Sequence, residues 1–347
     1  MESSLLAAVR GYASHTVGCP PDHVTAVSRF EHGNRHAVYK VSYLDATSGA
    51  KHVVVRVSYS GDLADCAQAE REARVLKQVD GVAAPLLYDF SATSAWFETP
   101  AMCMAFVRGD PRELSSVPPA GLERLGSAVG WVHGRPVDDV AAGLTTADDI
   151  ASYAEGRLQS ITSRLTWVRD RLPAPIQARV TVAAGLLVRS LEEWRDAESF
   201  RTAEPLALLH GDIGPGNILW GPDPVLIDWE YTRLGDPADE IAYTFDQNGL
   251  APPHRDAFWR GYRESIRGLP QLAEVADRVT WWEPVTLLGS ALWWVERWVR
   301  RIDADVAGKV DPAVPREQGY YRDHVVRRLD RLDDLILTAS SSRTSGS

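Results

Sequence analysis

The sequence predicts an α+β fold with two lobes, a small antiparallel β-sheet followed by a larger and mostly helical part. Up to about residue 107, short runs rich in Val and Tyr alternate with turns, as they do in antiparallel sheets. Beyond Gly109, long segments have the composition and periodicity of amphipathic helices. We therefore predict an N-terminal lobe over 1–107, a C-terminal lobe over 108–337, and a disordered tail over 338–347 that is rich in Ser, Thr and Gly.

The N-terminal lobe is predicted to hold one small antiparallel sheet. Its elements, in chain order, are a helix over 3–15, strands over 24–31, 37–44 and 51–59, a helix over 64–79, and strands near 85–91 and 102–107. The turn 32–35 separates the first two strands, and a turn with Ser48-Gly49 precedes the third.

The C-terminal lobe is predicted to be helical apart from a segment of strands and loops over 206–230. The predicted helices cover 120–135, 147–171, 176–200, 238–248, 255–267, 272–302 and 318–337. Pro284 is expected to bend or restart the helix through 272–302, because proline lacks the N–H that a helix interior uses.

Charge and cysteine content restrict the partners and the compartment. The formal net charge is −10, with −2 over residues 1–110 and −8 over the rest, which disfavours a nucleic-acid partner. The acidic excess permits a cationic ligand, although it serves equally well to keep the protein soluble. Three cysteines without C-x-x-C spacing, no signal-peptide pattern and no apolar run of about 18 residues predict a cytoplasmic protein without a membrane span.

Residues 208–230 carry the most informative polar pattern of the chain. Asp212 and Asn217 follow the spacing H-x-D-x-x-x-x-N, and Asp228 ends an apolar run shortly afterwards. Phosphoryl transfer from a nucleotide needs a carboxylate that orients and deprotonates the acceptor hydroxyl, and oxygen ligands that hold Mg²⁺ on the phosphates. We therefore predict that Asp212 is the catalytic carboxylate and that Asn217 and Asp228 bind Mg²⁺. Tight backbone geometry around these groups is expected from three glycines, Gly211, Gly214 and Gly216.

Three motifs in this region resemble one enzyme family. They are His210-Gly-Asp-Ile-Gly-Pro-Gly-Asn-Ile-Leu219, Ile227-Asp-Trp-Glu230 and Gly235-Asp-Pro-Ala-Asp-Glu-Ile-Ala242. In them the chain is similar to the aminoglycoside phosphotransferases and choline-kinase-like small-molecule kinases, over roughly residues 25–300. The resemblance implies a protein-kinase-like fold and transfer of the γ-phosphate of ATP or GTP to a hydroxyl group of a small molecule. His-Gly-Asp, in place of His-Arg-Asp, favours small-molecule kinases over protein kinases.

The resemblance leaves the acceptor open. An aminoglycoside-type antibiotic is the leading prediction, and a sugar, choline, homoserine or a macrolide are alternatives. A protein kinase is disfavoured, because only residues 231–236 follow Glu230 before the next helix starts, which is too short for an activation segment. A nucleotide-binding pseudokinase scaffold is the alternative from another class, although it would be expected to lack one of the three residues above. We expect a monomer or weak homodimer that binds neither nucleic acid nor a membrane.

The same resemblance assigns nucleotide-binding residues. Arg56, in Val-Val-Val-Arg-Val, occupies the strand position where many family members have a phosphate-binding Lys, and a guanidinium binds phosphate oxygens in a different geometry. Glu72 resembles the helix Glu that pairs with this cation, with Glu70 as the competing candidate. A turn would cover the phosphates with backbone N–H groups, and the segment linking the lobes would bind the adenine edge. The further residues predicted to contact the nucleotide are Gly33, Asn34, Arg35, Met104, Ala105, Val107 and Ile227.

A third set of residues is predicted to contact the acceptor. Tryptophans and carboxylates are concentrated near the C-terminal end, where they could stack on a sugar or cationic ring and bind its amines. Core packing is the favoured interpretation for most of the tryptophans, because Trp294 and Trp298 are four apart on one helical face. The predicted acceptor residues are Glu230, Trp281, Trp282, Glu283 and Glu296.

Other polar residues are predicted to be structural. Asp236 is expected to cap the helix that starts at Pro237. Glu240 stands where the family has an Asp that braces the catalytic loop, a departure from the family pattern. His133 is expected to make a structural hydrogen bond.

Overall fold

The structure is a computed structural model that describes residues 2–30, 36–45, 47–79, 81–137, 143–144, 147–168, 171–195, 206–269, 272, 274–308, 314 and 316–344. The fold is α+β, as predicted, with a small antiparallel sheet and a larger helical part. The chain falls into two compact units. The first comprises residues 1–145, 208–234 and 250–268, and the second comprises 146–207, 235–249 and 269–347. The lobe boundary at residue 107 stays a prediction.

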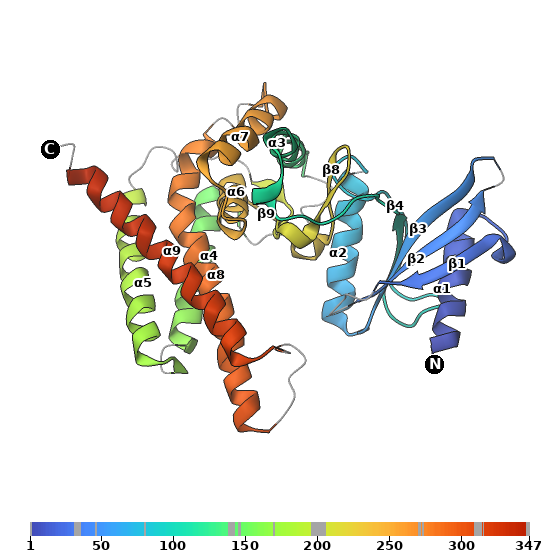
Figure 1. The fold of residues 1–347 in the computed structure, drawn as a ribbon, viewed down its shortest axis with the longest axis horizontal. Coiled ribbons are helices and arrows are strands. Elements are labelled where there is room, and N and C mark those ends of the chain that lie inside the picture. Colours follow the sequence, from blue (N-terminus) through green and yellow to red (C-terminus); the bar gives the residue numbers. More distant parts are fainter. Residues whose placement is uncertain are drawn as a thin grey trace. The chain divides into compact units, whose positions relative to one another are not determined.

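The first unit contains the predicted antiparallel sheet (Figure 1). Its strands are β1 (Val24–Arg29), β2 (His36–Asp45), β3 (Gly49–Ser58), β4 (Leu87–Ser91) and β5 (Ala101–Ala105), in the order β1-β2-β3-β5-β4. Each strand predicted for this region therefore exists, with its ends displaced by a few residues. β3 is the central strand, paired with β2 on one side and with β5 on the other, and its Arg56 lies opposite Met102.

Both faces of this sheet are covered by helices, which explains why the last four residues of β3 are all buried. Because side chains alternate along a strand, Val53 and Val55 point to one face, where they join a buried cluster with α1 (Glu2–Val17). Arg56 points to the other face and meets α2 (Leu63–Val79). The cation predicted to bind phosphate therefore lies between its own strand and α2.

Two further helices of the first unit pack unusually closely. The unit also contains the helices η1 (Pro21–His23), η2 (Leu114–Ser116), α3 (Pro119–His133) and α7 (Pro252–Ser265). A Cβ on Gly261 would lie 1.8 Å from the carbonyl oxygen of Glu123, so α3 and α7 approach as only glycine allows. Nδ1 of His133 and the hydroxyl of Tyr262 form a 2.9 Å hydrogen bond, which confirms the structural role predicted for this buried histidine.

The second unit is helical. Its helices are α4 (Ile150–Val168), α5 (Ala174–Arg195), α6 (Pro237–Gln247), α8 (Val275–Val306) and α9 (Gln318–Thr344). α8 is the central helix, since it packs against each of the other four (Figure 1). Pro284 lies inside α8, which continues past it, so the restart considered for this helix does not occur. α9 ends at Thr344, and its last turns cover residues 338–344, where the sequence predicts a disordered tail.

A buried ion pair holds the start of α6. The carboxylate of Asp236 accepts hydrogen bonds from two nitrogens of Arg278, at 2.9 and 3.0 Å, and from the indole N–H of Trp282 at 2.8 Å. It also accepts from the amide N–H of Ala238, so Asp236 caps the helix as predicted. Neither charged side chain has exposed surface, and a buried charge without such partners would be strongly destabilising.

Among the helices of the described ranges, none is both long and apolar enough to cross a bilayer.

Candidate active site

The segment in which the sequence predicts the chemistry folds into short strands and single turns. These elements are β6 (Ala207–Leu209), η5 (Pro215–Asn217), β7 (Ile218–Trp220), β8 (Pro224–Leu226), η6 (Trp229–Tyr231) and β9 (Arg233–Gly235). The β7–β8 hairpin reverses the chain, and the N–H of Ile227 donates to the carbonyl of Asn217 at 2.9 Å. The hairpin thereby brings Asp228, the next residue, back to the neighbourhood of Asn217.

Asp212 and Asn217 are joined directly. The side-chain nitrogen of Asn217 donates to the carboxylate oxygen Oδ2 of Asp212 and to its backbone carbonyl, both at 2.9 Å. The N–H of Gly214 donates to the same carbonyl at 3.0 Å. Because the amide nitrogen is used in these bonds, the side-chain oxygen of Asn217 takes part in neither of them.

A buried histidine links the loop to the segment between β8 and Asp228. The N–H of Asp212 donates to Nδ1 of His210 at 3.2 Å, so Nδ1 is an acceptor and the proton is on Nε2. Nε2 then donates to the carbonyl of Ile227 at 2.9 Å. The ring has no exposed surface and packs edge-on against Trp229, with ring centroids 4.6 Å apart. His210 is therefore a neutral connector between the two halves of the site.

Only one of the three glycines in the loop is required by the geometry. Gly211 has φ +92°, and a Cβ there would lie 2.2 Å from the carbonyl oxygen of Tyr231. A larger residue would therefore displace the backbone next to Asp212. Gly214 and Gly216 do not have a positive φ that favours glycine, and a Cβ at either position would meet open space. For those two positions, the expectation that tight backbone geometry needs glycine is wrong.

Asp228 has an unusual backbone conformation. Its φ of 66° makes it the one non-glycine residue with a positive φ in the part of the chain that the structure describes. Asp tolerates the left-handed region better than most residues, but the conformation still costs energy. Such conformations persist where the surroundings enforce them, and they are concentrated at functional sites.

The carboxylate of Asp228 is in an electrostatically unfavourable setting. Burial, opposed by the guanidinium of Arg56, raises the pKa of this carboxyl to about 6. Nearby carboxylates contribute to the increase in pKa, namely those of Glu230, Glu72 and Asp212. Since 44% of the Asp228 side chain is exposed, the group is accessible to a ligand. A bound cation would stabilise its charged form.

Arg56 connects this carboxylate to α2. Its guanidinium forms an ion pair with Glu72, and another of its nitrogens lies 3.7 Å from Oδ1 of Asp228. The side chains of Arg56 and Glu72 are 9% and 3% exposed. Burial alone would lower the pKa of Arg56, but the charge of Glu72 more than offsets this and the pKa is raised. Glu70, the competing candidate, is exposed on the same helix.

Two oxygen donors fit a Mg²⁺ ion beside the catalytic loop. Asp228 offers an accessible carboxylate among other negative charges, and Asn217 offers an amide oxygen that its bonds to Asp212 do not use. Mg²⁺ prefers such oxygens and fills its other positions with water and substrate phosphates. Within the described ranges, no group of three or more His, Cys, Asp or Glu side chains could hold a metal ion. Phosphate oxygens would therefore have to complete the coordination.

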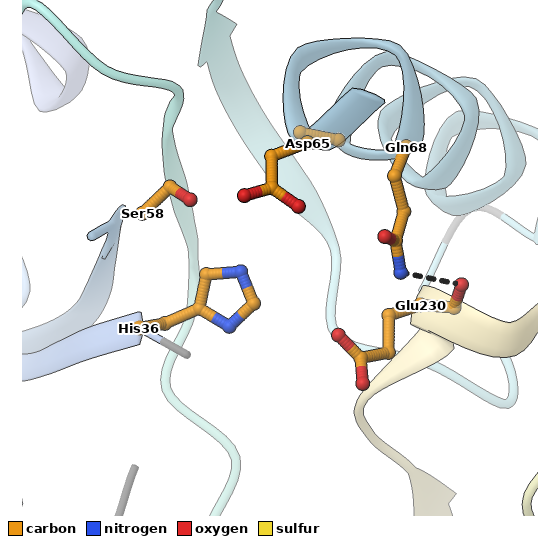
Figure 2. Close-up of a pocket in the computed structure, with 6 residues that line it drawn as sticks. His36, Ser58, Asp65, Gln68 and Glu230 are labelled. Atoms are coloured by element: carbon orange, nitrogen blue, oxygen red, sulfur yellow. Dashed lines mark hydrogen bonds between the residues drawn. The ribbon is translucent and has the colours of Figure 1, made fainter. Parts of the chain in front are cut away.

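A polar pocket lies next to this site in the first unit (Figure 2). It is lined by His36 at the start of β2, Ser58 at the end of β3, three residues of α2 and Glu230 of η6, the α2 residues being Asp65, Gln68 and Ala69. The figure shows the imidazole of His36 and the carboxylates of Asp65 and Glu230 facing one open space. The side-chain nitrogen of Gln68 donates to the backbone carbonyl of Glu230 at 3.1 Å.

The other residues predicted to bind nucleotide are only partly described. Met104 is nearly buried in β5, and Ala105 ends that strand, where its N–H donates to the carbonyl of Leu86 at 2.8 Å. Val107 follows two residues later, outside the strand. The turn with Gly33, Asn34 and Arg35 lies outside the described residues. The nucleotide-binding roles of all these residues therefore stay predictions.

Four of the residues predicted to contact the acceptor lie on α8, in the second unit. Trp282 has no exposed surface, because its ring is in the core and its N–H is bound to Asp236, so we do not retain it as an acceptor residue. Glu283 is 9% exposed, and Glu296 accepts a 2.7 Å ion-paired hydrogen bond from Arg300. Trp281 is half-buried. Glu230 is thus the one acceptor candidate that lies in the same unit as Asp212.

Three residues of this site have no role predicted from the sequence, namely Gln68, Trp229 and His210, although the last two stand in the motifs. Gln68 contacts a residue far away in the sequence, so no local spacing indicates it. Trp229 and His210 do carry a signal, since Trp229 directly follows the predicted metal ligand Asp228 and His210 stands two residues before the predicted base Asp212. A buried aromatic pair that supports the loop could have been predicted there.

The fold and this arrangement define a phosphotransferase. Residues 26–275 match the phosphotransferase enzyme family, and because the match covers well over half of the chain, the chain belongs to this family. Acyl-CoA dehydrogenase family member 10 of Mus musculus is 27% identical over 262 residues, which cover 71% of this chain and 22% of that protein. The chain thus spans about a fifth of the length of this curated relative.

Solved structures show the same fold. Choline kinase of Cryptosporidium parvum is similar with a TM-score of 0.64 at 13% identity, over 95% of this chain and 96% of that one. Spectinomycin phosphotransferase, in complex with ADP and spectinomycin, is similar with a TM-score of 0.58 at 12% identity, over 90% of this chain and 93% of that one. The protein-kinase-like fold predicted from the motifs is confirmed.

Proposed function

We propose that the chain transfers the γ-phosphate of ATP or GTP to a hydroxyl group of an aminoglycoside-type antibiotic or a related amino sugar, with Mg²⁺ as cofactor. The observation that best supports phosphotransfer is a pair of contacts of Asn217. Its side chain donates to Asp212, and its backbone carbonyl accepts from the N–H of Ile227, the residue before Asp228. A base and two oxygen donors for a metal ion then lie in one loop system, as phosphoryl transfer requires.

Asp212 is the group that acts on the acceptor. Its carboxylate would accept the hydrogen bond of the attacking hydroxyl, hold that oxygen toward the γ-phosphate and take the proton as the oxygen–phosphorus bond forms. The hydrogen bond from Asn217 fixes the orientation of this carboxylate without neutralising it. His210 holds the backbone of the same residue from the other side.

Arg56, Asp228 and Asn217 act on the nucleotide. Arg56 would bind phosphate oxygens, and its pairing with Glu72 fixes its direction. Asp228 and Asn217 would hold Mg²⁺, which when bound would neutralise charge on the phosphates and orient them. The adenine or guanine ring of the nucleotide would be bound by Met104, Ala105, Val107 and Ile227.

Support for a cationic acceptor comes from the charge around the site. Glu230 lies two residues beyond Asp228, and its carboxylate faces the pocket that also holds the carboxylate of Asp65 (Figure 2). Amino groups of an amino sugar would be attracted to such a pocket. The fold is shared with a spectinomycin phosphotransferase, which supports an antibiotic as acceptor and resistance as the biological role.

A second candidate acceptor is a hydroxylated acyl compound. The curated relative with 27% identity bears the name of an acyl-CoA dehydrogenase, and this chain matches only part of it. The choline kinase likeness keeps amino alcohols such as choline among the alternatives as well. We further propose a cytoplasmic monomer or weak homodimer, consistent with three cysteines that form no disulfide.

The test is a transfer screen with the purified full chain and γ-³²P-labelled ATP or GTP. The acceptors are aminoglycosides, macrolides, sugars, homoserine, choline and hydroxylated acyl thioesters, each with Mg²⁺ and with EDTA. We expect Mg²⁺-dependent labelling of at least one aminoglycoside, and none with Asp212→Asn. Labelling of another class only would reassign the acceptor. Nucleotide binding without transfer to any acceptor would favour the pseudokinase scaffold.

A further inference from the structure

Two residues of α2 reach the phosphotransfer site from one face of that helix. Glu72 forms the ion pair with Arg56, and Gln68, one turn earlier, donates from its side-chain nitrogen to the carbonyl of Glu230 at 3.1 Å (Figure 2). Residues four apart on a helix lie on the same side. One turn of α2 therefore supports the cation on β3 and also the backbone that follows Asp228.

The backbone at Asp228 needs support of this kind. A left-handed conformation at a residue other than glycine is unfavourable and relaxes when the surroundings release it. Two of the hydrogen bonds that hold the following residues lie directly after Asp228. The indole N–H of Trp229 donates to the carbonyl of Leu226 at 2.9 Å, and Gln68 holds Glu230 from α2.

We propose that Gln68 is a positioning residue for Asp228. By holding the carbonyl of Glu230, it keeps the preceding residues in η6 and maintains the left-handed backbone that sets the direction of the Asp228 carboxylate. This inference rests on the proposed function, because it takes Asp228 to be part of the Mg²⁺–nucleotide site. It also implies that a displacement of α2 changes phosphate binding and metal binding together, since Glu72 and Gln68 move with the same turn.

The chain offers a matched control. Gln78 is on the same helix, is half-buried like Gln68, and donates to a backbone carbonyl, that of Pro136, also at 3.1 Å. Gln68→Met and Gln78→Met each remove one such hydrogen bond with little change in size or helix propensity. Only the first bond reaches the segment after Asp228.

Calorimetry measures nucleotide affinity for each protein with Mg²⁺ and with EDTA. In Gln68→Met, we expect the gain in nucleotide affinity that Mg²⁺ provides to fall by about 3- to 10-fold. This is the change in affinity that corresponds to the net free energy of one hydrogen bond. Affinity in EDTA and the thermal midpoint should stay at the wild-type values, as should all values for Gln78→Met. Without nucleotide, amide hydrogen exchange over residues 229–232 should become faster in Gln68→Met alone.

The proposal is overturned if Gln68→Met keeps the full Mg²⁺-dependent gain, if Gln78→Met loses as much, or if exchange over 229–232 is unchanged. Wild-type protein that gains no affinity from Mg²⁺ would contradict the proposed function and this inference with it. Wild-type protein that gains affinity, with Gln68→Met gaining equally, would contradict this inference alone.

Discussion

The side-chain nitrogen of Asn217 lies 2.9 Å from the carboxylate of Asp212 and donates a hydrogen bond to it. The same nitrogen holds the carbonyl of Asp212, so one amide fixes both the backbone and the side chain of the proposed base. An amide is neutral, and it therefore orients the carboxylate without removing the charge that attracts the acceptor proton. Asn217 thus has a role toward the base in addition to its predicted role toward Mg²⁺.

Replacing the base should separate catalysis from binding. In Asp212→Asn, we expect kcat to fall by about 10²–10⁴-fold, because the group that orients and deprotonates the hydroxyl is lost. Nucleotide Kd should change by less than about twofold. Asp223→Asn is the control, since its side chain is 83% exposed in the β7–β8 turn. Retention of more than about a tenth of the wild-type activity by Asp212→Asn would be incompatible with the role of a base.

Replacing the metal carboxylate should weaken binding and activity together. In Asp228→Ala, we expect the Mg²⁺-dependent part of ATP affinity to fall at least about tenfold, as loss of support for a metal typically does. Asp228→Asn separates charge from backbone, because Asn tolerates the left-handed conformation. Calorimetry with and without Mg²⁺ gives the result. If both variants keep the Mg²⁺-dependent affinity, the metal assignment is wrong.

Arg56 and Glu72 should behave as one unit. Removing either partner leaves a buried charge unpaired, which typically costs about 3–5 kcal/mol, whereas removing both does not. A double-mutant cycle with Arg56→Ala and Glu72→Ala should therefore show coupling in unfolding free energy and in ATP KM. The cycle of Arg56→Ala with Glu70→Ala, an exposed residue of the same helix, is the comparison. Effects that add within about 0.5 kcal/mol for Glu72 would rule out the pairing.

We expect His324, in the second unit, to make the folded protein less stable in acid. The ring of His324 stacks on Trp294, with centroids 3.8 Å apart, and burial and then the charge of Arg328 lower its pKa to about 4. The unfolded chain, with a pKa near 6.5, binds this proton between about pH 4 and 6.5, and the native state does not. The contribution of this residue is therefore complete above about pH 6.5 and is lost as the pH falls. His324→Gln should flatten the dependence of unfolding free energy on pH over this window, measured by urea denaturation, and parallel curves would contradict the assignment.

The salt dependence of KM should report the charge of the acceptor. If the acceptor is cationic, its KM should rise with ionic strength, because carboxylate–ammonium attraction is screened over about 8–10 Å, while nucleotide KM changes less. Glu230→Gln should then raise acceptor KM, with exposed Glu70→Gln as the control. A flat profile together with sensitivity to Trp281 replacement would favour a neutral sugar or macrolide.

Much of this site could be predicted because its signals are local. Strand alternation and the fixed spacing of the His-Gly-Asp motif do not depend on distant residues, and the β7–β8 hairpin is short. The pairing of Arg56 with Glu72 is implied by the family resemblance, and position in the sequence does not by itself separate Glu72 from Glu70. The structure shows the ion pair with Glu72. The predicted strands and the loop residues that the structure brings together are all of this kind.

The features that could not be predicted depend on tertiary packing. The sequence shows that the segment of α8 is rich in tryptophan, but it does not show which of these side chains faces the core. The predicted contact of Trp282 with the acceptor is therefore wrong, because its indole N–H is bound to buried Asp236. Pro284 is tolerated because α8 packs against four other helices that stabilise it. The contact of Gln68 with Glu230 joins residues far apart in the sequence. The left-handed backbone of Asp228 is compatible with an aspartate, but the residue type alone does not predict it.

The arginine at position 56 has a consequence for how the protein can be regulated. Lysine is a target of acetylation, which removes its charge, and it can lose its proton when buried, whereas arginine does neither. The charge of Glu72 raises the pKa of Arg56 further above the ordinary value of an arginine, so the guanidinium keeps its charge. The phosphate contact that we propose for Arg56 therefore has no acylation switch, and nucleotide analogues that react with amines should leave this position unlabelled.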